Sequence, residues 1–290
     1  MTYARFLELF PDNAACVEYL KQRHYPDGSN CPKCGKRTKF HRIKSRAAYS
    51  CQYCRHQVYP TAGTIFHKST VSMQLWFYAI FLMSSTRCGI SAKQLEREIG
   101  VTYKTAHRMF KQIRKLLMDE DDEPLSGEVE VDETYVGGAP RGVGRRGRPG
   151  KSSKKVPVLG MVERRGRLRA RVMPDAKKDT LMPHIVEHIL PKSMIYTDEY
   201  AAYGSLTGAG YGHRRIAHYK KIYVDGDVTT NTIEGFFGLM KNGIRGVYHS
   251  VSTKYLQSYL DEYSFRYNRR DAAQPMFWAI LDRVTQLRAA

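Results

Sequence analysis

The sequence predicts a multidomain protein in which small N-terminal modules precede a larger α/β domain. Three observations support this prediction: two C-x-x-C pairs near the N-terminus, then a helix, a glycine and a basic helix, and alternating strand-like and helix-like segments from residue 127 onward. A chain of 290 residues is long enough for two or three domains with cores of their own. The expected parts are a helical segment (1–25), a cysteine-held ribbon (26–68), a helix-turn-helix (69–118), an acidic linker (119–126), and the α/β domain with C-terminal helices (127–290).

The chain is strongly basic, with 47 Lys and Arg against 28 Asp and Glu and a formal net charge of +19. Basic side chains that neutralise phosphates release condensed counterions, so a nucleic acid is the expected partner. A basic surface with no dedicated partner is the alternative. The most apolar stretch, 75–83, is too short to span a bilayer, and the N-terminus lacks the pattern of a signal peptide. We therefore expect a cytoplasmic protein that makes no contact with a membrane.

Four of the six cysteines form two close pairs, with sixteen residues (35–50) between the pairs. The members are Cys31 and Cys34, then Cys51 and Cys54. This spacing is typical of tetrahedral zinc, and four thiolates leave no open position, so the zinc would be structural. A redox dithiol is the less favoured alternative. Short strands expected near 39–43 and at 49–50 complete the pattern of a zinc ribbon.

The two remaining cysteines, Cys16 and Cys88, have no partner at metal-site spacing and are expected to be buried. Cys16 lies in the first segment, which is expected to be helical up to about Tyr25, because its apolar positions recur at three- and four-residue steps.

A helix-turn-helix is predicted after the apolar helix at 71–84. The first helix, 91–100, opens with a capping-box pattern and ends on Gly100, and the second begins at Thr102. An ordinary helical hairpin with a solvated basic face is the alternative; DNA contact is favoured because the chain is basic and a ribbon precedes the pair. The outer face of the second helix carries Tyr103, Lys104, His107, Arg108, Lys111 and Arg114.

The α/β domain is expected to begin after the acidic run at 119–123. Strands are predicted from 128 to near 137, at 156–163, 168–173 and 194–198, and within 214–224, with a helix at 179–190 capped by Asp179. A Gly/Arg/Lys loop at 141–155 contains Arg145, Arg146, Arg148 and Lys151, which are expected to contact DNA. This order of strands and helices is that of a ribonuclease H-like fold, with a mixed five-stranded sheet and flanking helices.

Three acidic residues stand out in this domain: Asp132 and Asp198 at strand ends, and Glu234 in the first turn of a helix. Carboxylates are poor strand and core residues unless they have partners or a metal. Their oxygens suit Mg²⁺, so convergence of the three would form a site for divalent cations. Each also has a simpler explanation: Asp132 as an exposed strand residue whose face Glu130 shares, Asp198 as a helix cap, and Glu234 as part of a capping box.

Segments around these acids resemble the acidic motifs of a family of bacterial insertion-sequence transposases. These proteins combine an N-terminal zinc ribbon with a DDE-type catalytic domain and are related to the Merlin elements of eukaryotes. The matching segments are 127–138, 196–200 and 231–241, and the resemblance covers roughly residues 25 to 270. The 35 residues between Asp198 and Glu234 are also typical of DDE enzymes.

The resemblance implies a DNA transposase that binds the terminal inverted repeats of its element, cuts the ends and joins them to target DNA. Asp132, Asp198 and Glu234 would hold two Mg²⁺ or Mn²⁺ ions, with Asn231 as an alternative third ligand. Lys241 lies seven residues after Glu234, on nearly the same side of the helix, and would contact a phosphate.

Two other functions remain open at this stage: a non-catalytic zinc-ribbon and helix-turn-helix regulator, and a ribonuclease H-like nuclease without strand transfer. The expected partner is double-stranded DNA. The protein is expected to associate with the nucleoid in the bacterial cytoplasm. Since two ends must be processed together, a homodimer or larger assembly on DNA is expected.

Overall fold

The computed structural model describes residues 1–118, 123–137, 155–216 and 229–286. The chain divides into two compact units, Met1–Leu116 together with Ala272–Ala290, and Leu117–Asp271. The division differs from the expected domains at the C-terminus, where residues 272–290 belong with the N-terminal unit rather than with the α/β domain. Among the described residues, no helix is both long enough and apolar enough to cross a membrane.

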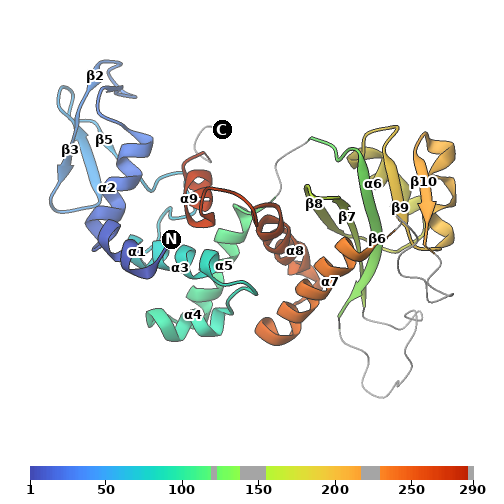
Figure 1. Ribbon diagram of the computed structural model, residues 1–290. Helices are drawn as coiled ribbons and strands as arrows, with labels where there is room; N and C mark the ends of the chain where they lie inside the picture. The colour runs from blue at the N-terminus through green and yellow to red at the C-terminus, as the bar shows by residue number, and fades with distance from the viewer. Residues whose placement is uncertain (119–122, 138–154, 217–228, 287–290) are drawn as a thin grey trace. The chain divides into compact units, whose positions relative to one another are not determined.

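The N-terminal unit combines short strands with helices (Figure 1). Its elements are α1 (Tyr3–Leu9), α2 (Asn13–His24), β1 (Ser29–Asn30), β2 (Arg37–Thr38), β3 (Phe40–Ile43), β4 (Ala48–Cys51), β5 (Gln57–Val58), α3 (Met73–Ser85), α4 (Ala92–Ile99), α5 (Tyr103–Lys115) and α9 (Met276–Gln286). The strands form a β1–β2 pair and a three-stranded β3–β4–β5 sheet, as a zinc ribbon requires.

The expected N-terminal helical segment is two helices rather than one. The chain leaves the first helix at Phe10, and Asp12 caps α2 by accepting a hydrogen bond from the Ala15 amide at 2.8 Å. Pro11 lies between them and cannot donate the amide hydrogen bond that a continuous helix needs.

Aromatic packing explains why α9 belongs to the N-terminal unit. The Phe277 ring contacts Phe6 and Phe10, with ring centroids 6.0 and 5.9 Å away, and α9 packs on α2 and α3. Cys16 is fully buried in this unit, as predicted, whereas Cys88 is exposed. The prediction for Cys88 was wrong, because the residue lies after the end of α3 and not within that buried helix.

The second unit is a mixed five-stranded sheet between helices (Figure 1). Its elements are β6 (Glu128–Val136), β7 (Val156–Glu163), β8 (Leu168–Val172), α6 (Lys178–His188), β9 (Met194–Thr197), two 3₁₀ helices η1 (Ala201–Ser205) and η2 (Thr207–Ala209), β10 (Gly212–Arg215), α7 (Asn231–Gly243), a π-helix (Ile244–Tyr248) and α8 (Thr253–Asn268). The strand order is β10-β9-β6-β7-β8, with β6, β9 and β10 parallel and β7 antiparallel to its neighbours.

Two details of this unit differ from the expectation. The fifth strand, β10, begins at Gly212, before the expected range, and much of that range lies outside the described residues. The cap position of α6 is Lys177, and Asp179 lies in the first turn instead.

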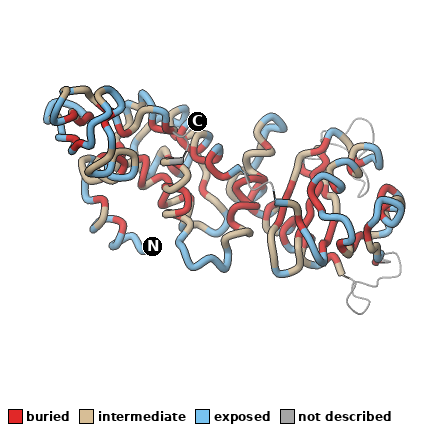
Figure 2. Tube along the Cα trace, turned by 90° about the horizontal axis from the view of Figure 1, so that it is seen from above, coloured by how far each residue is buried: buried red, intermediate tan, exposed pale blue. Residues whose placement is uncertain are grey.

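The two faces of the sheet pack against different helices, which follows from the alternation of side chains along a strand. Val129 and Val131 of β6 lie in a core with α6 and η1, whereas Val136 lies in a core with α7 and α8. Figure 2 shows the buried segments in red and the exposed segments in pale blue. Glu130, Asp132 and Thr134 alternate with Val129 and Val131, so they belong to the face that α7 covers.

Candidate active site

Asp132 and Asp198 meet where β9 ends beside the middle of β6. β6 and β9 pair in parallel, with Glu128 opposite Met194 and Glu130 opposite Tyr196. Two residues further along each chain come Asp132 and Asp198, and the latter follows directly after the last residue of β9. The predicted neighbouring strands therefore bring these two carboxylates together at the edge where parallel strands end.

A third carboxylate joins them, but it is not the one that the sequence predicted. Among the described residues, Asp132, Glu133 and Asp198 place carboxylate oxygens within 4.8 Å of one another. Glu133 follows Asp132 and belongs to the opposite face, where its carboxylate accepts a 2.7 Å hydrogen bond from the buried Tyr203 hydroxyl. β9 has already ended at this level, so residues from both faces can approach Asp198.

The close approach of these carboxylates is electrostatically unfavourable. Burial raises the pKa of Asp132 to about 8, and the charges of Asp198, Glu133 and Glu234 contribute to the rise. Three carboxylates this close repel one another, and hard oxygen donors of this kind suit Mg²⁺ or Mn²⁺. The donor set therefore fits a divalent cation at this position.

Helix α7 runs alongside β6 and carries the other two predicted residues. The Thr232 amide bonds to Glu130 at 2.9 Å, and the Lys241 ammonium donates to Thr134 Oγ1. From Thr232 to Lys241 the helix advances about 13.5 Å, and from Glu130 to Thr134 the strand advances about 13 Å. The two contacts can therefore form at the same time. Asp132 lies midway between the two attachment points on β6.

Glu234 lies outside the tight carboxylate cluster. Its exposed side chain accepts a 2.8 Å hydrogen bond from Thr230, the N-cap residue of α7. The expected capping box with Asn231 is not formed, and Thr230 takes the cap position instead. The charge of Glu234 nevertheless raises the pKa of Asp132.

Lys241 faces the same region from the far end of α7. Burial and the nearby Arg245 lower the pKa of its ammonium, while Asp132 acts in the opposite direction. An ammonium group held beside Asp132 can neutralise a phosphate oxygen that approaches the carboxylates.

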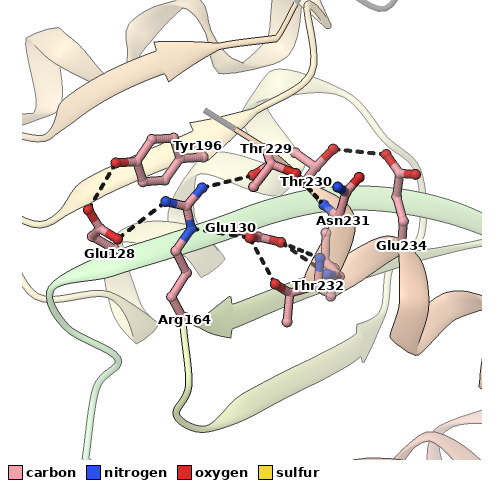
Figure 3. Close-up of polar contacts among 10 residues, drawn as sticks. Glu128, Glu130, Arg164, Tyr196, Thr229, Thr230, Asn231, Thr232 and Glu234 are labelled. Atoms are coloured by element: carbon pink, nitrogen blue, oxygen red, sulfur yellow. Dashed lines mark hydrogen bonds and ion pairs between the residues drawn. The ribbon is translucent and has the colours of Figure 1, made fainter. Parts of the chain in front are cut away.

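Glu130 is a polar residue whose role the sequence did not indicate, although its shared face with Asp132 was visible. Its carboxylate is fully buried and accepts hydrogen bonds from the amides of Thr232 and Ile233 and from Arg164 (Figure 3). The start of α7 is thus capped by a strand residue a hundred positions earlier, a relationship that local sequence patterns cannot reveal.

The four paired cysteines are arranged as tetrahedral zinc requires. Their sulfur atoms all lie within 4.8 Å of one another, with Cys31 to Cys54 at 3.7 Å and Cys34 to Cys51 at 3.9 Å. The edge of a tetrahedron with Zn–S bonds of about 2.3 Å is about 3.8 Å long, so these separations fit the ion. Although burial opposes it, hydrogen bonds from Thr38 and from backbone amides lower the pKa of Cys51 to about 6.

The predicted helix-turn-helix is formed by α4 and α5. The Ser91 and Thr102 side chains cap the two helices, and Gly100 between them adopts a left-handed conformation with φ 67°. Tyr103, Lys104, Arg108 and Lys111 are exposed on α5 and His107 is half-buried, whereas Arg114 is buried and leaves the outer face. The loop residues Arg145, Arg146, Arg148 and Lys151 lie outside the described residues.

Comparison with known families matches both parts of the chain. Residues 124–268 match the model of the ISXO2-like transposase domain, and residues 11–57 match that of the transposase zinc-ribbon domain. A protein in transposable element ISH50 of Halobacterium salinarum is 27% identical over 271 residues, which is 87% of this chain and 91% of that protein. A transposase-like protein of Haemophilus influenzae is 27% identical over 100 residues, 34% of this chain and 80% of the relative.

Two solved structures also resemble the chain at low similarity. One is the pre-cleavage Mos1 transpososome, with 10% identity, a TM-score of 0.29 and coverage of 69% of this chain and 73% of that chain. The other is the Mos1 strand transfer complex, with 12% identity, a TM-score of 0.30 and coverage of 72% of this chain and 75% of that chain. Scores this low carry no conclusion about function. The family-domain match spans the strands and helices that hold Asp132, Asp198, Glu234 and Lys241. The chain therefore belongs to the family of ISXO2-like transposases.

Proposed function

We propose that this protein binds the terminal inverted repeats of its element, cleaves the DNA ends in a divalent-metal-dependent reaction and joins them to target DNA. The observation that carries the proposal is the meeting of Asp132, within β6, and Asp198, directly after β9, in a chain of this family. A polyanionic substrate agrees with the formal charge of +19.

Asp132 and Asp198 are the proposed ligands of two Mg²⁺ or Mn²⁺ ions, and Glu133 is close enough to Asp132 to share in holding one. When bound, such ions activate the attacking oxygen and stabilise the leaving oxygen of an in-line displacement at phosphorus. Lys241, held at Thr134, would hold a phosphate oxygen of the substrate and orient the reacting strand.

Glu234 is the proposed third acid of the DDE set. Turning away from Thr230 would bring its carboxylate toward Asp132, whose pKa its charge already influences. Asn231 lies on the same first turn but carries no charge, so it would compensate less of a cation's charge.

The N-terminal unit is the proposed DNA-binding part of the protein. The structural zinc of the ribbon would be held by Cys31, Cys34, Cys51 and Cys54. The exposed face of α5 presents basic side chains, among them Lys104, Arg108 and Lys111, and the ring of Tyr103. We propose that a homodimer or larger assembly holds the two ends together, on the nucleoid in the bacterial cytoplasm.

The experiment uses duplex oligonucleotides that carry the terminal sequences flanking the gene. Wild-type protein is expected to bind them, cut them only with Mg²⁺ or Mn²⁺, and join a pre-cut 3′-hydroxyl end to a second duplex. Asp132→Asn and Asp198→Asn are expected to bind the ends normally and to lose cleavage.

Cleavage that persists in both variants would show that the active site is elsewhere. Cleavage without joining of the pre-cut end would identify a nuclease rather than a transposase. Binding without cleavage by the wild type would favour a regulator.

A further inference from the structure

Three carboxylates of the proposed catalytic set come from three elements: Asp132 from β6, Asp198 from the end of β9 and Glu234 from α7. Divalent-metal chemistry requires that these elements keep fixed positions relative to one another. One ion pair, between the buried Glu130 and the partly buried Arg164, contacts all three elements (Figure 3).

Glu130 joins β6 to α7. Its side chain is 0% exposed and accepts hydrogen bonds from Thr232 N and Thr232 Oγ1, both at 2.9 Å, and from Ile233 N at 3.1 Å. The first amides of a helix have no partners within the helix and carry partial positive charge, so a carboxylate placed there holds the helix end firmly. Thr232 and Ile233 directly precede Glu234.

Arg164 extends the connection to β9. Its guanidinium donates to Glu130 at 3.2 Å and to the Thr229 carbonyl oxygen at 3.2 Å, and it lies 4.0 Å from the centre of the Tyr196 ring. The contacts therefore fall two residues before each acid: Glu130 before Asp132, Tyr196 before Asp198, and Thr232 before Glu234.

A contribution to folding stability alone does not explain why an ion pair stands at this position. An isolated buried carboxylate is costly, and apolar residues of similar volume often replace buried ion pairs without loss of stability. Most of the rest of the α7–sheet interface is apolar, with Ile233, Phe236 and Phe237 in one core with Val158 and Val162. The hydrogen bond from Lys241 to Thr134 is a second polar contact, near the other end of α7. Packing alone would tolerate sliding of the helix, whereas hydrogen bonds to two successive amides fix one register.

We propose that Glu130, paired with Arg164, is a positioning residue that sets where Glu234 stands relative to Asp132 and Asp198. This inference rests on the function proposed above, because it concerns the same site. Glu130 touches neither substrate nor metal; it acts through the start of α7.

The test compares Glu130→Gln with Glu128→Gln. Glu128 is the matched control, because it lies on the same strand and face as Glu130. It bonds to Arg164 at 3.3 Å and to Tyr196 at 3.1 Å, so these bonds reach the turn after β7 and β9 rather than α7, and its side chain is 53% exposed. Thr232→Val removes one donor to Glu130 without changing side-chain shape.

For each variant we would measure unfolding of the zinc-loaded protein without added Mg²⁺ or Mn²⁺, the Kd for end DNA, kcat and KM for cleavage, and the Mn²⁺ concentration at half-maximal rate. Glu130→Gln is expected to reduce kcat by ~10–100-fold and to raise the Mn²⁺ requirement, with Kd and KM for DNA unchanged. Thr232→Val is expected to reduce kcat by roughly 3–10-fold. Glu128→Gln is expected to stay within about twofold of the wild type.

Equal kcat and Mn²⁺ dependence in Glu130→Gln and Glu128→Gln would overturn the proposal, as would a loss confined to thermal stability. If Glu130→Gln does not fold, the kcat and Mn²⁺ dependence of Thr232→Val are compared with those of Glu128→Gln instead, and equal values would overturn the proposal. A wild type that does not cleave would refute the proposed function itself, which distinguishes the two failures.

Discussion

Gly160 lies directly opposite Asp132 in the β6–β7 pair, and α7 packs against its backbone. A Cβ at this position would lie 2.6 Å from Ile233 Cδ1 and 2.7 Å from Phe237 Cζ. The absence of a side chain beside Asp132 is therefore what lets the helix that carries Glu234 approach the strand.

Gly160→Ala is expected to destabilise the protein by about 1–3 kcal/mol, because neither core side chain can yield without displacing the helix. It should also reduce cleavage, since α7 moves away from Asp132. Gly238→Ala is the control: a Cβ there meets nothing within 4 Å, so the change should stabilise the helix by about 0.5–1 kcal/mol. Urea denaturation of both variants measures these effects, and equal stabilities would contradict the close packing.

Asp198→Asn is expected to make the protein without bound Mg²⁺ or Mn²⁺ more stable, because one of three mutually repelling carboxylates becomes neutral. The Tyr200 amide, 2.9 Å from Asp198 Oδ1, keeps an acceptor in the variant. The melting temperature of the zinc-loaded protein without added Mg²⁺ or Mn²⁺ should rise by roughly 2–5 °C, and the further rise that Mn²⁺ produces in the wild type should disappear.

Glu187→Gln is the matched control, since it neutralises an exposed carboxylate of α6 that is not a member of the carboxylate cluster. It should leave both melting temperatures unchanged. A Mn²⁺-dependent shift that survives in Asp198→Asn would place the cation elsewhere.

Removal of zinc is expected to unfold the ribbon, because metal binding and folding of such small modules are coupled. Cys34→Ser should abolish stoichiometric zinc and the protection of ribbon amides from hydrogen exchange. Cys88→Ser should retain both, because Cys88 is exposed and outside the four-sulfur cluster. Zinc analysis together with hydrogen exchange makes the comparison, and full zinc content in Cys34→Ser would refute the ligand assignment.

Arg55 and Gly35 occupy equivalent positions in the two cysteine turns, and both have positive φ, 59° and 67°. Each donates its amide to the carbonyl of the first cysteine of its pair, at 3.1 Å for Arg55 and 2.9 Å for Gly35. Arg55→Gly should therefore stabilise the ribbon by about 0.5–1 kcal/mol and Gly35→Ala should destabilise it by about as much. Thermal unfolding with zinc present tests this, and effects of the same sign would contradict it.

Lys104→Ala and Lys111→Ala are expected to weaken end binding and to reduce the slope of log K against log salt by about one each, if both side chains contact phosphates. Lys93→Ala on α4 is the control, because its ammonium is paired with Glu96 at 2.5 Å. Binding measured over a range of salt concentrations checks this, and equal slopes for all three variants would argue against α5 as the DNA-contacting helix.

The sequence predicted the features that local patterns determine. Cysteine spacing indicated the ribbon, capping residues and Gly100 indicated the helix pair, and the order of strands and helices indicated the mixed sheet. Asp132 and Asp198 could be paired in advance because both end strand-like segments that were expected to be neighbours.

Long-range relationships were not predictable in the same way. Glu133 was not predicted as a ligand because neighbouring side chains of a strand point to opposite faces, and Asp132 is its neighbour. Glu133 reaches the cluster because β9 ends at Thr197, just before Asp198. The bonds of Glu130 to Thr232 and the packing of α9 on α3 join residues far apart in the chain. Buried Arg114 and exposed Cys88 likewise depend on tertiary neighbours.

The most direct test of the proposed active site is a crystal structure of the protein with end DNA and Mn²⁺, using anomalous scattering to locate the ions. We expect two manganese peaks, with carboxylate oxygens of Asp132, Asp198 and Glu234 within about 2.0–2.3 Å of a metal, and Glu234 released from Thr230. Peaks absent from this site, or a Glu234 carboxylate still bonded to Thr230 while both ions are bound elsewhere, would contradict the account.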